Sequence, residues 1–161
     1  MLKRREAGGQ SGLTLVELIA VTAIVLLLAT MAVPVGATLV KRQKEIELRQ
    51  ALREIRTALD KFQADSTLFP GIKSNLSVAN EEGYPEELEV LVEGVDTGDA
   101  VGTTLKYLRR MPIDPMTGEA DWATRSSRDQ PDSLFTDHVN IFDVRTKSEK
   151  VALDGTRYDQ W

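Results

Sequence analysis

The stretch Ser11-Gly12-Leu13-Thr14-Leu15-Val16-Glu17-Leu18 decides how the rest of this 161-residue chain is organised. It places one carboxylate at the start of a long apolar run and a small residue just before that run. No charged side chain occurs from 18 to 40, and at about 1.5 Å per residue a helix over this run would be about 35 Å long. Such a helix can cross the hydrocarbon core of a bilayer. The sequence therefore predicts a transmembrane helix.

The residues before the apolar run are ordered unlike an ordinary secretory signal. Such a signal carries its small-residue cleavage site after the apolar core, whereas here the glycines and serine of residues 8–12 come before it. A cut after Gly12 would remove only a polar leader, residues 1–12, and would leave the apolar helix in the mature chain. Glycine suits such a site because, without a Cβ, its backbone can lie extended and close to a protease.

The pattern Gly12, a hydrophobic residue, Thr14, Leu15, an aliphatic residue and Glu17 resembles the class III leader of type IV prepilins and pseudopilins. Leu13 stands where that family most often has Phe. The resemblance implies that a prepilin peptidase cuts between Gly12 and Leu13 and methylates the amine that it exposes. Basic residues flank the apolar run on both sides, so their count leaves the orientation open. Because that peptidase faces the cytoplasm, the resemblance implies a cytoplasmic N-terminus.

Glu17 is a candidate assembly residue. A carboxylate inside an apolar segment is costly unless it has a partner. In a helical assembly the freed amine of Leu13 on a neighbouring subunit could be that partner. The alternative is that Glu17 lies in the first turn of the mature helix, where the helix dipole favours an anion. The leader pattern around Glu17 favours the assembly role.

Pro34 is the second candidate assembly residue. A proline inside a helix removes one hydrogen bond and kinks the axis, which membrane helices tolerate better than soluble ones. A simple bend is one interpretation, and local melting when subunits pack into a filament is the other. Members of the family often carry a proline at this distance into the apolar helix.

Residues 13–40 thus form the predicted transmembrane and filament-core helix, and residues 41–64 are expected to continue it. Apolar residues spaced four, three, four and three apart predict one buried stripe: Leu48, Leu52, Ile55, Leu59 and Phe62. The other faces are charged, which predicts a helix covered on one side only.

Residues 65–161 are enough for one modest periplasmic globular head. Pro70 and Gly71 are expected to end the long helix. A short second helix is predicted over 84–92, and short strands are predicted over 121–124, 139–144 and 150–153. A long helix packed against a small C-terminal antiparallel sheet is an α+β architecture.

Three blocks narrow the resemblance to the major pseudopilin of type II secretion systems: Tyr84-Pro85, residues 107–115, and residues 154–161. Family members usually have Trp-Gly after the Asp-Pro of the second block, whereas this chain has Met116-Thr117-Gly118, which indicates a divergent branch. The resemblance implies a pilin-like fold, an inner-membrane location and assembly into a periplasmic pseudopilus. The implied partners are other copies of the chain, the prepilin peptidase, minor pseudopilins, and the inner-membrane platform with its secretion ATPase. The alternatives are a pilin or minor pilin of a surface fibre, and a membrane-anchored periplasmic binding domain.

We expect no cofactor, although calcium is an alternative, because pseudopilins of this kind resemble one another in holding calcium in a C-terminal loop. Calcium prefers six to eight oxygen ligands with several carboxylates. The corresponding stretch here, 143–154, carries basic residues, and only Asp143 and Asp154 are candidate ligands.

Other chemistry has little support in the sequence. The chain has no cysteine and a single histidine, His138, without the spacing of a triad, so we expect no enzyme. Type IVa major pilins commonly have a C-terminal pair of cysteines. This chain has none, which favours a secretion role over a surface fibre. The net charge of −5 argues against nucleic acid as a partner.

Overall fold

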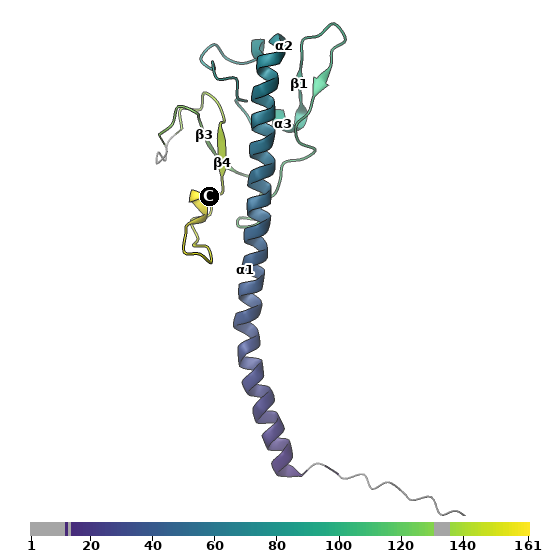
Figure 1. Cartoon of the computed structure of the whole chain (residues 1–161), viewed down its shortest axis with the longest axis vertical. Coiled ribbons are helices and arrows are strands. Elements are labelled where there is room, and N and C mark those ends of the chain that lie inside the picture. The colour runs from purple at the N-terminus through teal and green to yellow at the C-terminus, as the bar shows by residue number, and fades with distance from the viewer. Residues whose placement is uncertain (1–11, 13, 131–135) are drawn as a thin grey trace, which may run out of the picture. The chain divides into compact units, whose positions relative to one another are not determined.

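The computed structural model describes residues 12, 14–130 and 136–161 (Figure 1). The chain divides into two compact units, Met1–Val40 and Lys41–Trp161. We call them the N-terminal unit and the head unit and describe each by itself. One helix, α1 (Leu15–Leu68), contributes residues to both.

In the N-terminal unit, α1 confirms the prediction of a long apolar N-terminal helix. Among the described residues, α1 is the one helix that is long and apolar enough to cross a membrane. Every described side chain from 14 to 40 is exposed. Length and composition alone support this membrane assignment.

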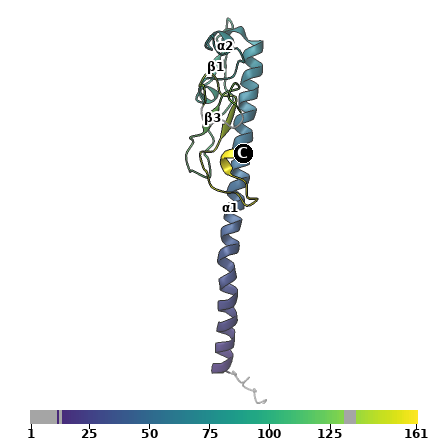
Figure 2. The same cartoon turned by 90° about the vertical axis from the view of Figure 1, so that its left-hand side faces the viewer.

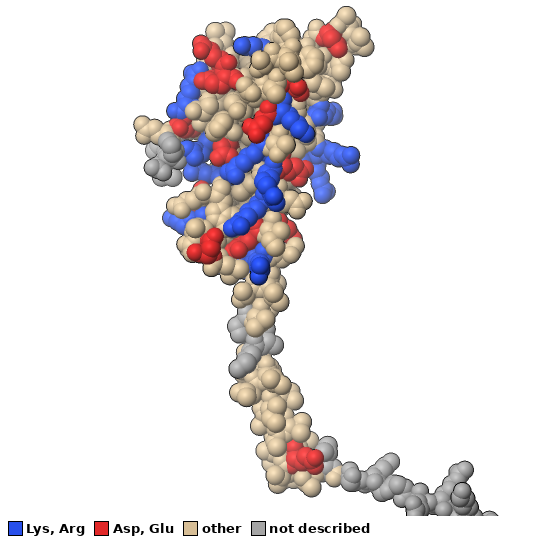
Figure 3. All heavy atoms as spheres, in the orientation of Figure 1, with Lys and Arg blue, Asp and Glu red and all other residues tan. Residues whose placement is uncertain are grey.

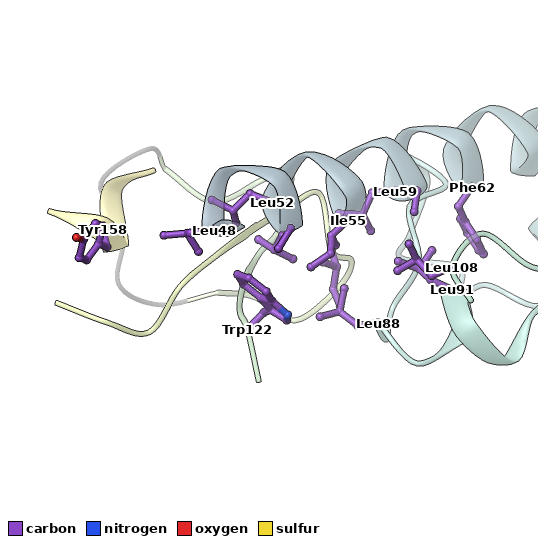
Figure 4. Close-up of a cluster of buried hydrophobic side chains, with 14 of the residues drawn as sticks. Leu48, Leu52, Ile55, Leu59, Phe62, Leu88, Leu91, Leu108, Trp122 and Tyr158 are labelled. Carbon is purple, nitrogen blue, oxygen red and sulfur yellow. The ribbon is translucent and has the colours of Figure 1, made fainter. Parts of the chain in front are cut away.

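In the head unit, the predicted apolar stripe of α1 forms one wall of the core. Its five members are between 0% and 2% exposed. Figure 4 shows them pointing toward side chains from the rest of the head unit, namely Leu88, Leu91, Leu108 and Trp122. Full burial of one such side chain stabilises a fold by about 1.5–3 kcal/mol, so this stripe holds α1 against the head.

The end of α1 differs slightly from the expectation. The helix ends at Leu68, and Phe69 is extended, with φ −111° and ψ 106°. Pro70 does stop α1, but it also begins a second short helix, α2 (Pro70–Ser74). Proline suits a first helical position because its fixed φ is already helical and its missing N–H is not needed there.

The prediction of a helix over 84–92 is largely wrong, because the helix that forms in this region, α3, spans only Val90–Glu93. The carbonyl of Tyr84 accepts a hydrogen bond from Asn80 Nδ2 at 2.7 Å. The carbonyl of Pro85 accepts one from Ile141 N at 2.7 Å. These tertiary bonds use the carbonyls that a helix would need for its own ladder.

Two separate two-stranded antiparallel sheets form, where one sheet was predicted. In the first, β1 (Val95–Asp96) pairs with β2 (Thr104–Leu105), and the sequence did not indicate this hairpin. In the second, β3 (Ala123–Arg125) pairs with β4 (Asp143–Arg145), with Thr124 opposite Val144.

The second sheet lies near the predicted strands but is shorter. The predicted strand over 139–144 begins only at Asp143, because Ile141 pairs with Pro85 instead of with a strand. The predicted third strand over 150–153 is reduced to a single bridge between Val151 and Arg157. A 3-10 turn, η1 (Tyr158–Gln160), follows it.

Figure 1 shows β3, β4 and the C-terminus on one flank of this part of α1 and β1 on the other flank. Figure 2, turned by 90°, shows that the elements of the head unit gather on one side of the helix. The observed layout is therefore α+β, with a long N-terminal helix and small antiparallel sheets.

A substitution at Gly71 tests the packing of α2 against the β1–β2 hairpin, which was not predicted from the sequence. A Cβ placed there would lie 2.3 Å from the carbonyl oxygen of Thr97 and 2.5 Å from the Gly98 backbone. We expect Gly71→Ala to destabilise the protein by about 1–3 kcal/mol through overpacking. Lys73→Ala, an exposed change in the same short helix, is the matched control. Chemical unfolding of the full chain in detergent, followed by circular dichroism, measures both, and equal stabilities would contradict the observed contact between α2 and the β1–β2 hairpin.

Candidate functional site

The predicted processing site lies at the edge of the described residues. Gly12 is exposed, and a Cβ added to it would meet nothing within 4 Å. Packing within the described chain therefore does not require glycine at this position. Leu13, and the leader residues before Gly12, lie outside the described residues.

Thr14 caps the start of α1. Its hydroxyl accepts a hydrogen bond from the backbone N–H of Glu17 at 3.2 Å, which satisfies one of the free donors of the first turn. The N–H of Leu18 donates to the Thr14 carbonyl at 3.0 Å. The cap explains why the helix begins here in the sequence.

Glu17 lies in this first turn, and its side chain is exposed. The position matches the alternative in which the helix dipole favours its charge. Its carboxylate forms no ion pair with another described residue. The assembly role stays a prediction, since the amine of Leu13 falls outside the described residues and the structure contains one copy of the chain.

The surface of α1 that follows Glu17 is apolar and uncovered. Its large exposed side chains include Leu18, Ile19, Val21, Ile24, Val25, Leu26, Leu27, Leu28, Val35, Leu39 and Val40. The hydroxyl of Thr22 donates to the carbonyl of Leu18 at 2.9 Å, and that of Thr30 donates to Leu27 at 2.7 Å. The helix thus satisfies these polar groups internally, as a lipid environment requires.

The second candidate assembly residue, Pro34, lies within α1, and the helix runs on past it to Leu68. Its side chain is outside what the structure describes, and whether the helix melts there in an assembly stays a prediction.

In the head unit, Glu45 of α1 holds the C-terminal segment. It is a buried carboxylate, 9% exposed. It accepts hydrogen bonds from the Tyr158 hydroxyl and from the backbone N–H of Leu153, each at 2.8 Å. Burial, together with the hydrogen bond to the Glu45 carboxylate, raises the pKa of Tyr158 to about 12.

Two arginines of α1 complete this attachment. Arg49 lies over the ring of Trp161, 4.1 Å from its centroid. Arg56 donates to the Asp143 carboxylate at 2.6 Å and to the carbonyls of Val144 and Trp161 at 3.1 and 3.0 Å. We call Glu45, Arg49 and Arg56 the C-terminal clasp.

The clasp was not predicted from the sequence, because charged residues on the water-facing side of a helix most often serve solubility. The only signal was position: Glu45, Arg49 and Arg56 flank the buried stripe at Leu48 and Leu52. A charged residue at the border of an apolar stripe can reach the elements that cover it.

The two candidate calcium ligands, Asp143 and Asp154, have other partners in the head unit. Asp143 is occupied by the Arg56 guanidinium. Asp154 accepts from the backbone N–H and hydroxyl of Thr156, which lowers its pKa, with Arg49 at 3.6 Å. Within the described ranges, no three or more His, Asp or Glu residues are grouped so that they could hold a metal. The expectation that the chain works without a cofactor stays a prediction.

Two residues of the block at 107–115, Pro112 and Asp114, accept hydrogen bonds that hold parts of the head unit together. Asp114 is fully buried, and it accepts hydrogen bonds from the Met116 N–H at 2.8 Å and from the Thr146 hydroxyl. Trp122 is also buried and donates to the Pro112 carbonyl at 3.0 Å.

The single histidine, His138, is exposed, with a φ of 55°.

Comparison of the chain with protein-family models, with curated proteins and with solved structures found no match.

The clasp generates a stability prediction. Glu45→Ala leaves the buried Tyr158 hydroxyl and the Leu153 N–H without their acceptor, which costs about 1–3 kcal/mol for an unsatisfied buried donor. Glu47→Ala removes the same charge two residues further along α1, from an exposed side chain that accepts a hydrogen bond from Gln43. It should change stability by less than about 0.5 kcal/mol. Thermal unfolding of the full chain in detergent distinguishes them. A loss for Glu45→Ala no larger than that for Glu47→Ala would show that the clasp does not stabilise the head unit.

Proposed function

We propose that this chain is a structural subunit of a type II secretion pseudopilus. In this proposal it polymerises through its N-terminal helix and helps to drive protein export across the outer membrane. The proposal rests on the leader pattern from Gly12 to Glu17 and on its continuation into an apolar helix whose described side chains are all exposed up to Val40.

The leader pattern from Gly12 to Glu17, placed before an exposed apolar helix, is the observation that carries this proposal. Lipid alone could cover the apolar surface, as in a simple membrane anchor. An anchor, however, gains nothing from a cleavage motif placed before its apolar run or from a carboxylate in its first turn. A filament subunit uses both, because it must leave the bilayer and bury the same surface against copies of itself.

Gly12 fits the role of a recognition residue for the peptidase. Nothing in the described chain approaches its Cα closely enough to require glycine, so local packing does not explain the residue. Cleavage after Gly12 would leave Leu13 with a free amine. This amine lies four residues before the first-turn carboxylate, Glu17. The proposed partner of Glu17 is this amine on a neighbouring subunit.

In the proposed setting the chain performs no reaction. It resides in the inner membrane, with the N-terminus cytoplasmic and the head periplasmic, until it is added to the periplasmic filament. The prepilin peptidase, the minor pseudopilins and the platform with its secretion ATPase are its proposed partners.

Glu17→Ala tests the proposed function. Loss of the carboxylate removes the ion pair that sets the register between subunits. We therefore expect filament yield to fall by about tenfold or more, which corresponds to a loss of about 1.4 kcal/mol per added subunit. Glu47→Ala, which removes one exposed carboxylate from the same helix, is the control.

The measurement is the amount of chain in sheared filaments relative to the amount in the inner membrane, by immunoblot of cells that carry the secretion machinery. The expected result is a normal membrane level of Glu17→Ala with few filaments. Filaments at the level of the unsubstituted chain would exclude the assembly role of Glu17.

A further inference from the structure

In one hollow on the head unit, most of the charged lining residues are cations. Its volume is about 630 Å³, and its charged lining residues are Arg53, Lys61, Arg109, Arg110 and one acid, Glu54. All four cations are exposed, and none of them forms an ion pair with another described residue. Figure 3 shows many Lys and Arg side chains, with Asp and Glu among them, on one face of this unit. We call the hollow lined by Arg53, Lys61, Arg109 and Arg110 the basic hollow.

The cations of the basic hollow come from two segments that the fold brings together. Arg53 and Lys61 lie on α1, whereas Arg109 and Arg110 follow Leu108, whose N–H donates to the Leu91 carbonyl at 2.8 Å. Burial of Leu108 in the core fixes the second segment beside the helix. The lining of this hollow therefore carries four cations and one carboxylate, and it attracts anionic groups.

A second hollow on the same unit has the opposite charge. Its volume is about 360 Å³, and Glu86, Glu87 and Asp96 line it without any Lys or Arg. These three carboxylates are exposed. They belong to the stretch 81–99, which contains eight acidic residues and no basic one. We call this the acidic hollow.

We propose that the basic hollow of one copy of this chain receives the exposed carboxylates Glu86, Glu87 and Asp96 of a second copy. Opposite charge on the two surfaces is the argument for this partner. No residue lines both hollows, so one head unit can engage two neighbours at once. Such a contact is heterologous, and when its rotation does not close a ring it propagates as a helical filament.

The proposal deepens the proposed function and rests on it, because a filament subunit needs a head contact that repeats from copy to copy. The contact lies between exposed charges. It should therefore steer addition and fix register, and it should weaken as salt screens it within about 10 Å at 0.1 M ionic strength.

Paired cysteines test the contact directly, since the chain has none of its own. The variant Arg110→Cys/Glu87→Cys carries one thiol in each hollow. In cells that express the full chain with the secretion machinery, mild oxidation should produce a ladder of dimers, trimers and longer covalent species. Lys73→Cys/Lys150→Cys, two exposed lysines that line neither hollow, is the control pair and should give no ladder.

The ladder distinguishes the proposed geometry from its competitors. A band at the dimer alone indicates an isologous contact and overturns the inference. An equal ladder from the control pair, or no covalent species from the test pair, overturns it as well.

Charge reversal provides the second readout. Arg109→Glu/Arg110→Glu should lower filament yield by about tenfold, since it sets like charges against each other. Adding Glu86→Lys/Glu87→Lys in the same chain restores the complementarity and should restore the yield. Lys73→Glu/Lys150→Glu makes the same change in net charge elsewhere and should leave the yield unchanged.

The two proposals fail separately. If the unsubstituted chain forms filaments and the charge-reversal variants form them in equal amount, the proposed contact is overturned and the proposed pseudopilin function stands. A chain that never forms filaments with the machinery present overturns the proposed function.

Discussion

The apolar surface of α1 has to be kept from water, and the rest of the structure depends on how this is done in each unit. In the head unit, the stripe from Leu48 to Phe62 is covered by the chain itself, with residues from α3, the strands and the loops packed on it. From Leu15 to Val40 the described helix surface is exposed. The first surface explains why a head with only short strands can fold, and the second belongs to a helix that is long and apolar enough to cross a membrane.

Short strands leave the head unit dependent on specific side-chain contacts. Its two sheets contain two and three residues per strand, which is too little ladder to hold a sheet by itself. The clasp therefore has a clear physical task. Glu45 and Arg56 tie backbone groups of the C-terminal segment to α1, so that buried donors and acceptors are satisfied where no sheet satisfies them.

Long periodic features of this fold could be predicted from the sequence, and short ones could not. The helix and its buried stripe follow from spacing alone, because many residues carry the same signal. The hairpin of β1 and β2 was missed, since two residues per strand carry too little pattern. The helix expected from Tyr84 failed because tertiary hydrogen bonds captured its carbonyls, and the clasp was invisible because Glu45 looks like any other surface acid. Of the candidate site, the position of Glu17 in the first turn of the helix could be predicted, whereas its proposed partner would belong to another copy of the chain.

We propose that the motif around Gly12 is processed, so that the apolar helix becomes the start of a filament subunit. The decisive measurement is mass spectrometry of the chain purified from the inner membrane of cells with a prepilin peptidase. The expected mature chain begins at Leu13 and carries an N-methylated amine. A chain that keeps residues 1–12 in the presence of the peptidase, or one that is cut after the apolar run, would contradict the proposal.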